Sequence, residues 1–332
     1  MLLQVASSCH SKEVQRGVVM AGTRYETPYF TKKGAMPGPT IVVISGVHGD
    51  EPAGYLAARR LAKWKIERGT LVIMPDAHRE AIRRNERGYP GNMNRMFPGK
   101  ANGDDMQRLA YEIWQVIREA HPDLLLTLHE SRDFHADNPS RYGQTFCFDF
   151  DELRPYMNRA LRRVNADIET RKHKFLIFVD PFPTCPTYQS WSKLKTPATS
   201  IETSKTLPLK TRVKYQLMAV QAFFDEAGLK YEQDDISPLS SASWPSQAGA
   251  PRDSAQADSE RPSAPHIQQN PTGSANLSKT TRKKGETGGN AATTKSAAVQ
   301  GFPRILAIGA GALLLVWLAM RAVFSKPKRG RR

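Results

Sequence analysis

Cysteine is scarce in this chain, which has three cysteines among 332 residues. Cys9, Cys147 and Cys185 are odd in number, and no two of them have CxxC spacing. The sequence therefore indicates neither a disulfide framework nor a metal site built from cysteine. Cys147 lies in the apolar run at residues 145–148, so we expect it to be a buried core residue.

Negative charge is also in short supply. The chain has 48 Lys and Arg against 32 Asp and Glu, and residues 1–232 alone carry 34 basic and 26 acidic side chains. The basic residues are scattered singly, without interleaved aromatics or a nucleic-acid-binding motif. We therefore expect a basic solvated surface and no nucleic-acid partner. Binding of anionic substrates or of an anionic wall or membrane surface is the alternative.

Aromatic residues are nearly missing from residues 234–300, where Trp244 is the only Phe, Tyr or Trp. This stretch is rich in Ser, Ala, Pro, Gln, Gly, Thr and Lys. Such a composition cannot bury enough apolar surface to offset the entropy of an ordered chain. We predict one folded domain over residues 10–232 and a disordered linker over residues 233–302.

Charge is absent from residues 305–320, and with one arginine the apolar run continues to residue 324. As a helix, these 20 residues span about 30 Å, the thickness of a bilayer core. We predict a transmembrane helix over residues 303–325 and a basic tail over residues 326–332. The tail favours a cytoplasmic C-terminus and a folded domain outside the cell. The N-terminus has no signal-peptide pattern, so a tail-anchored cytoplasmic domain is the alternative.

Internal repeats are absent, and short apolar runs alternate with segments of helical periodicity. This alternation predicts an α/β fold: a mixed, largely parallel sheet with helices on both faces. Ligands bind at the carboxyl ends of strands in such sheets, so candidate site residues should follow strands. The expected strands are residues 41–45, 71–74, 124–128, 175–179 and 198–201, and the expected helices are residues 51–66, 104–120, 151–168 and 210–227.

Two histidines stand at the ends of predicted strands. His48 and Glu51 belong to the sequence GVHGDE, where Gly46 and Gly49 permit a sharp turn. His129 ends the run LLLTLH. Two histidines and a glutamate form a ligand set of catalytic zinc sites, with a fourth position left for water. The other histidines lack this context and are expected to be structural or surface residues: His10, His78, His121, His135, His173 and His266.

Glu202 follows a third apolar run, in the sequence TSIET. A carboxylate outside the ligand set can act as general base on metal-bound water, although a salt-bridged edge residue is the alternative reading. The loop at residues 87–99 contains two arginines, Arg87 and Arg95. One arginine can bind a carboxylate in a bidentate way, and the other can stabilise an oxyanion.

These four motifs occur in one order: HGDE, the run NMNRMFPG, a strand ending in His, and the strand end IET. In this order they resemble the succinylglutamate desuccinylase/aspartoacylase family, which belongs to the carboxypeptidase A-like zinc hydrolases. The resemblance covers about residues 40–205. It implies one zinc ion per chain, with His48, Glu51 and His129 as its ligands.

The same resemblance implies the remaining roles. Arg87 would polarise the scissile carbonyl, Asn94 and Arg95 would bind the free carboxylate of the substrate, and Glu202 would be general base and acid. The expected activity is hydrolysis of an amide bond in an acyl-amino acid or short peptide. The alternatives are a membrane-tethered carboxypeptidase that trims cell-wall peptides and an inactive binding module on a stalk.

Two features depart from the family pattern. Asn92 stands where members usually have an acidic residue, two positions before Asn94. Acylase members also have a C-terminal β-rich domain that narrows the pocket, whereas only about 30 residues separate Glu202 from the predicted linker. We expect an open pocket that suits a larger substrate, such as a peptide tail.

Overall fold

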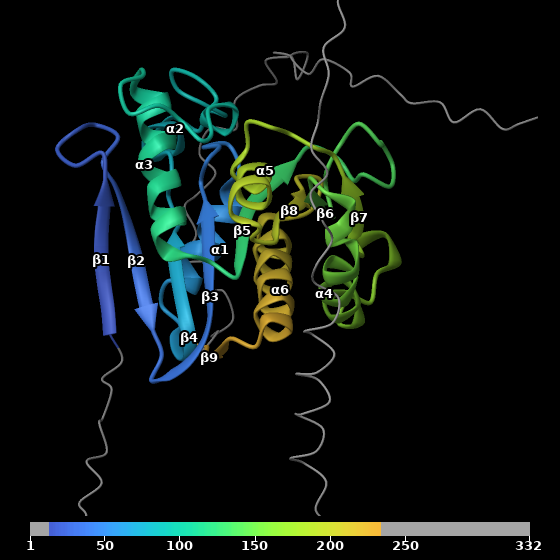
Figure 1. Ribbon diagram of the computed structural model, residues 1–332. Helices are drawn as coiled ribbons and strands as arrows, with labels where there is room; N and C mark the ends of the chain where they lie inside the picture. The colour runs from blue at the N-terminus through green and yellow to red at the C-terminus, as the bar shows by residue number, and fades with distance from the viewer. Residues whose placement is uncertain (1–12, 234–332) are drawn as a thin grey trace, which may run out of the picture. The chain divides into compact units, whose positions relative to one another are not determined.

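The apolar runs at residues 41–45 and 124–128 form adjacent parallel strands at the centre of a nine-stranded sheet (Figure 1). The structure is a computed structural model that describes residues 13–233. From residue 234 on, the predicted linker, transmembrane helix and basic tail lie outside the described residues, as do Cys9 and His10. None of the helices within residues 13–233 is long and apolar enough to cross a bilayer.

The sheet has the order β1-β2-β4-β3-β5-β8-β6-β7, and β9 pairs with β4. Strands β4, β3, β5 and β8 are mutually parallel, whereas β1, β2, β6 and β9 each make antiparallel pairs. The predicted mixed, largely parallel sheet is therefore confirmed. The strands are β1 (Glu13–Val19), β2 (Thr27–Lys33), β3 (Met36–Ser45), β4 (Lys65–Met74), β5 (Leu124–Ser131), β6 (Thr145–Phe148), β7 (Leu176–Val179), β8 (Ala198–Ser204) and β9 (Lys230–Glu232).

Helices cover both faces of this sheet, as predicted. Helices α1, α4 and α6 bury their apolar side chains in one hydrophobic cluster, and α3 packs into a second cluster on the opposite face. Strand β5 supplies both clusters, since Leu124, Leu126 and Leu128 face one and Leu125 faces the other. The helices are α1 (Pro52–Leu61), α2 (Arg79–Arg84), α3 (Asp105–Ala120), α4 (Arg154–Ala166), α5 (Pro186–Gln189) and α6 (Leu209–Ala227).

Two predicted helices differ from the structure in their extent. The helix expected over residues 51–66 ends at Leu61, because residues from Lys65 onward pair in the sheet as β4. The helix expected over residues 151–168 consists of a short 3₁₀ turn, Asp151–Leu153, followed by α4. The helices expected at residues 104–120 and 210–227 are confirmed to within one residue.

The prediction that Cys147 is a buried core residue is wrong, because its side chain is only partly buried. Its strand neighbours Phe146 and Phe148 point into the cluster beneath α4 and α6. Side chains alternate along a strand, so Cys147 points to the opposite face, the one that carries Glu202. The run at residues 145–148 therefore places both Thr145 and Cys147 on the face that carries Glu202.

Candidate metal centre and catalytic groups

The loop between β3 and α1 brings His48 and Glu51 to the carboxyl end of the parallel strands. Gly46 has a φ of +69°, a conformation that L side chains rarely adopt. Gly49 lies against the backbone of α2, where a Cβ would stand 2.1 Å from the carbonyl of Ala81. The two glycines therefore permit the turn, as the sequence predicts.

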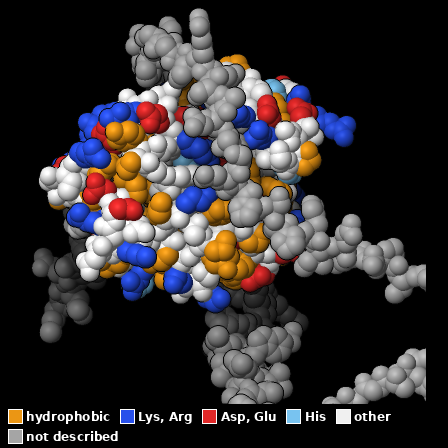
Figure 2. All heavy atoms as spheres, turned by 90° about the horizontal axis from the view of Figure 1, so that it is seen from above, with side chains coloured by type: hydrophobic (Ala, Val, Ile, Leu, Met, Phe, Trp, Pro, Cys, Tyr) orange, Lys and Arg blue, Asp and Glu red, His pale blue; other side chains and the backbone are white. Residues whose placement is uncertain are grey.

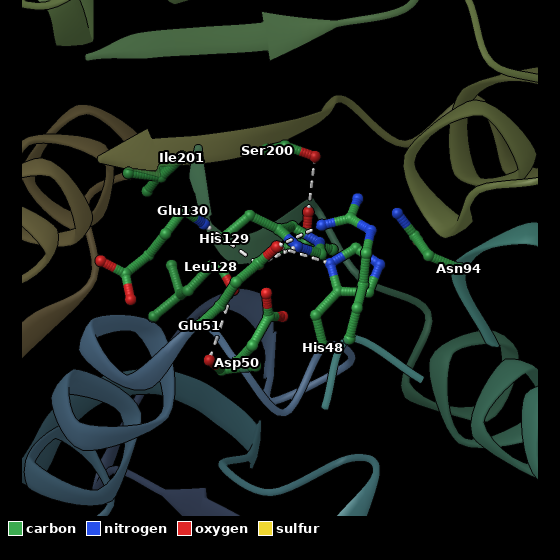
Figure 3. A network of polar contacts seen from close by, with 12 residues as sticks. His48, Asp50, Glu51, Asn94, Leu128, His129, Glu130, Ser200 and Ile201 are labelled. Atoms are coloured by element: carbon green, nitrogen blue, oxygen red, sulfur yellow. Dashed lines mark hydrogen bonds and ion pairs between the residues drawn. The ribbon is translucent and has the colours of Figure 1, made fainter. Parts of the chain in front are cut away.

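His48, Glu51 and His129 converge on one point. Their candidate ligand atoms lie within 4.8 Å of one another, and theirs is the only such group of His, Cys, Asp and Glu within residues 13–233. His48 Nδ1 contacts Glu51 Oε1 at 2.8 Å, and His129 Nδ1 contacts Glu51 Oε2 at 2.9 Å (Figure 3). Each residue is at most 3% exposed, so the three side chains form a buried cluster.

The charges of this cluster suit metal binding. Burial lowers the pKa of His48 to about 4, which leaves its imidazole neutral at neutral pH. Burial opposes ionisation of Glu51, but the two histidines outweigh it and hold the pKa of this carboxyl well below its ordinary value. Burial also lowers the pKa of His129, but Glu51 outweighs this effect and raises the pKa overall. A divalent cation can replace the proton that Glu51 favours on His129.

Two imidazoles and one carboxylate fit a divalent metal ion that keeps an open coordination position. Groups around the cluster orient these side chains. His48 Nε2 contacts Asn92 Oδ1 at 3.1 Å, and the backbone N–H of Glu130 donates to Glu51 Oε2 at 3.1 Å. Such outer contacts fix the ring orientation of a metal-binding histidine and the position of a metal-binding carboxylate.

Glu202 lies beside His129 on the adjacent strand, where the two residues pair directly. It is partly buried, and burial raises its pKa to about 7, although the nearby His129 opposes this shift. A carboxyl group with a pKa near neutrality can both accept and return a proton. His129 and Glu202 stand within strands β5 and β8 rather than after them, because pairing of the two strands continues to Ser131 and Ser204.

Arg87 contacts the ligand cluster from the loop that follows α2. Its Nη1 donates to Glu51 Oε1 at 2.9 Å, while its side chain is 43% exposed. Figure 2 shows Lys and Arg side chains interspersed with hydrophobic and other side chains over the molecule. A guanidinium in this place puts positive charge beside the cluster and within reach of solvent.

Asn94 and Arg95 lie in a short 3₁₀ turn, Met93–Arg95, whose first N–H groups are capped by Asn92. The side chain of Asn94 points toward the ligand cluster (Figure 3), and its buried Oδ1 makes no hydrogen bond within residues 13–233. The guanidinium of Arg95 stacks on Phe182, 3.9 Å from the ring centroid. The structure thus brings all seven predicted site residues to one edge of the sheet.

The described histidines outside the cluster have structural or surface positions, as predicted. His78 is fully buried and is the N-cap residue of α2, and its Nε2 lies 3.4 Å from the backbone nitrogen of Tyr89. His121 ends α3, and His135 and His173 bond to Arg141 and Tyr215. Sequence reasoning missed Glu130 and Arg212, which form a buried ion pair behind the ligands. The one local signal was the position of Glu130 directly after His129.

A parallel-centred α/β sheet with a buried His₂Glu cluster, an adjacent carboxyl of raised pKa and an arginine is an arrangement that a metal-dependent hydrolase can use. Residues 37–167 match the sequence model of the succinylglutamate desuccinylase/aspartoacylase catalytic domain. This region of the chain is therefore similar to the catalytic domain of that family, and the resemblance seen in the motifs is confirmed. The matched region includes the three candidate ligands and the arginine loop, whereas Glu202 follows it.

Individual relatives support the same assignment over part of the chain. The N-alpha-acetyl-L-2,4-diaminobutyric acid deacetylase of Halomonas elongata is 33% identical over 98 residues, which are 28% of each chain. The mDAP-bound form of Helicobacter pylori Csd4, a D,L-carboxypeptidase, has a TM-score of 0.56 and 25% identity, covering 59% of this chain and 52% of that one.

A Gln46His variant of Csd4 has a TM-score of 0.59 at 24% identity, covering 62% of this chain and 56% of that one. A succinylglutamate desuccinylase/aspartoacylase from Rhodobacter sphaeroides, at 19% identity and a TM-score of 0.51, shares the fold over 66% of this chain and 67% of its own. The chain spans less than a third of the deacetylase and about half of Csd4.

Proposed function

We propose that this chain is a zinc-dependent hydrolase that cleaves an amide bond in an acyl-amino acid or short peptide with a free carboxylate. The observation that carries the proposal is the placement of Glu202 next to His129, on the strand beside the buried ligand cluster. A general base must lie within reach of the water that it activates, and this position provides that reach.

The catalytic roles follow from these positions. Zinc bound by His48, Glu51 and His129 supplies Lewis-acid activation of water and of the scissile carbonyl. Glu202 takes the proton from the attacking water and returns it to the nitrogen of the leaving amine. Arg87 stabilises the negative charge that develops on the carbonyl oxygen.

Asn94 and Arg95 bind the free carboxylate of the substrate. The Asn94 side chain points toward the ligand cluster and Arg95 is held on Phe182 one residue later, so a carboxylate bound there stays close to the reacting bond. A guanidinium binds a carboxylate through two parallel hydrogen bonds, which fixes direction as well as distance. Binding energy at this end of the substrate thereby orients the amide.

Two substrate classes share this chemistry. The match to the diaminobutyrate deacetylase supports a small acyl-amino acid. The likeness to mDAP-bound Csd4 supports a peptide, which would make this chain a carboxypeptidase that trims cell-wall peptides. We further propose a single-pass anchor over residues 303–325, with the catalytic domain outside the cell. Accessibility of the domain to an external protease in intact cells tests that orientation.

The test of function is an assay of the zinc-loaded full chain on N-acyl-amino acids beside short peptides with free C-termini, including wall-type stem peptides. Release of amino acid from the acyl compounds supports a deacylase. Cleavage of the peptides alone supports the tethered carboxypeptidase. Zinc binding without turnover of any of these compounds would favour the binding-module alternative.

A further inference from the structure

Glu130 follows the candidate ligand His129 and is 3% exposed. A buried carboxylate is costly unless hydrogen bonds and an opposite charge compensate it. Glu130 has both, because one oxygen accepts from Arg212 Nη1 on α6 and the other accepts from the backbone N–H of Ala53 at 2.8 Å. Ala53 stands two residues after the candidate ligand Glu51, at the start of α1.

Glu130 also contacts Glu51 directly. Its backbone N–H donates to Glu51 Oε2 at 3.1 Å, the same oxygen that His129 Nδ1 contacts. The side chain of Glu130 therefore holds the chain just after one ligand, while its backbone holds the carboxylate of that ligand. Figure 3 shows Glu130 behind the cluster, pointing away from His48.

Gln216 lies one helical turn after Arg212 on the same face of α6. Its Nε2 is within hydrogen-bonding distance of the carbonyl oxygens of His129, at 2.7 Å, and Ile201, at 3.3 Å. It also lies 3.1 Å from Thr203 Oγ1. The contacts to Ile201 and Thr203 flank Glu202, so one amide group bridges the ligand strand and the general-base strand.

The rest of the buried face of α6 is apolar. Its C-terminal half buries Ala219, Val220, Phe223 and Phe224 against the sheet, whereas Arg212 and Gln216 lie in the N-terminal half beneath the site. Replacement of a buried ion pair by apolar residues is often neutral or stabilising. Stability alone therefore gives little reason for an arginine here, and its place under the ligands points to a positional role.

We propose that Arg212, Glu130 and Gln216 are positioning residues for the metal centre. The pair Arg212–Glu130 sets where the Glu51 loop stands relative to His129, and Gln216 sets the spacing between His129 and Glu202. This inference rests on the proposed function, since it assumes that the cluster holds zinc. It adds an element of the fold, helix α6, to the parts that decide metal affinity.

The experiment uses three variants of the full chain: Arg212→Met, the double variant Glu130→Gln/Arg212→Met, and the control Lys214→Met. Lys214 is an exposed basic residue on the same helix, so its loss tests a change of charge alone. The measurements are zinc affinity by competition with a chromophoric chelator, the visible spectrum of the Co²⁺-substituted protein, and the melting temperature without metal.

We expect Arg212→Met to weaken zinc binding by about 10- to 100-fold, the range seen when outer contacts of metal ligands are lost. Its Co²⁺ spectrum should shift, and Lys214→Met should match the wild type in both measurements. The double variant should regain melting temperature, because no unpaired charge stays buried, yet keep weakened zinc binding. If Arg212→Met does not fold, the double variant alone carries the test.

Wild-type zinc affinity and an unchanged Co²⁺ spectrum in the double variant would overturn the positioning role while leaving the proposed function intact. A wild-type chain that binds no zinc would overturn both. Gln216→Met separates the second part of the proposal: it should lower kcat with little change in KM, because it disturbs the general base more than substrate binding. An unchanged kcat would remove Gln216 from the positioning set.

Discussion

The ligand cluster and the arginine loop at residues 87–99 form two sides of one candidate site, but they are built differently. His48, Glu51 and His129 are at most 3% exposed and bond to one another. Arg87 is 43% exposed, and its loop has little regular structure beyond one 3₁₀ turn. Metal binding needs fixed geometry, whereas a substrate side benefits from a surface that can adjust. The difference predicts that changes in the cluster abolish function and changes in the loop alter its efficiency.

The largest effect should follow from His129→Ala. It removes one of three ligands from a buried position, so stoichiometric zinc binding and hydrolysis should both be lost. Metal analysis after gel filtration and the amide assay check this expectation. His135→Ala is the matched control, since His135 lies outside the cluster and bonds to the Arg141 carbonyl. Full zinc content in His129→Ala would contradict the ligand assignment.

Glu202→Gln should impair hydrolysis without impairing metal binding by the ligand cluster. The amide keeps the size of the carboxyl but cannot accept the proton, so kcat should fall by about 10²- to 10⁴-fold. Zinc content should stay at the wild-type level, because Glu202 is not among the ligands. Retained turnover would exclude Glu202 as the general base.

Arg95→Met tests the arginine loop at residues 87–99. It removes the guanidinium proposed to bind the substrate carboxylate, so KM should rise by about tenfold or more while kcat changes less. Steady-state kinetics on a peptide with a free C-terminus, and on its C-terminal amide, check this. For the C-terminal amide, KM should differ little between the variant and the wild type. Arg108→Met is the control: this arginine on α3 is partly exposed, and its replacement should leave both constants unchanged.

The pH dependence of kcat/KM should show an acidic limb that belongs to Glu202. Burial raises the pKa of this carboxyl to about 7, and the base works only when ionised. Activity is therefore lost as pH falls through the pKa in the folded protein. Bound zinc lowers that pKa by its positive charge, so the limb should lie between the ordinary value of 4.5 and 7. A profile that stays flat across this interval would contradict the role of Glu202.

Asn92→Asp should give the smallest change. Asn92 contacts both the ligand cluster and the arginine loop. Asn92 Oδ1 contacts His48 Nε2 at 3.1 Å and also caps the turn that holds Asn94. A carboxylate in this place strengthens the hydrogen bond from the imidazole and raises its basicity as a ligand. Zinc affinity should therefore increase, as measured by chelator competition, while KM stays near the wild-type value. Weaker zinc binding would contradict this account.

Three of the candidate site residues could be read from sequence because each stands where a buried apolar run gives way to polar residues. His48, His129 and Glu202 all occupy such places, and parallel strands bring them to one edge. The strand ends were placed too early at residues 128 and 201. Thr, Glu and Ser follow there, and only pairing between β5 and β8 makes these polar residues part of the sheet.

Other parts of the structure depend on contacts between residues that are far apart in the sequence. The buried pair of Glu130 and Arg212 joins residues 82 positions apart, and either residue by itself resembles an ordinary charged surface position. Strands β1 and β2 contain Arg and Lys among their apolar residues, because β1 is an edge strand and β2 lies beside it. In the sheet, β1 pairs with β2, and β2 pairs with β4.

Strand β8 lies between β5 and β6, although both of these precede it in the chain. During synthesis, β5 and β6 emerge with a gap between them that only residues 198–204 can fill, some 70 residues after the strand that β8 pairs with. Closing such a distant pair is slow compared with local contacts. All three candidate ligands are therefore synthesised before Glu202, the candidate general base. The candidate site is complete only once β8 has paired between β5 and β6.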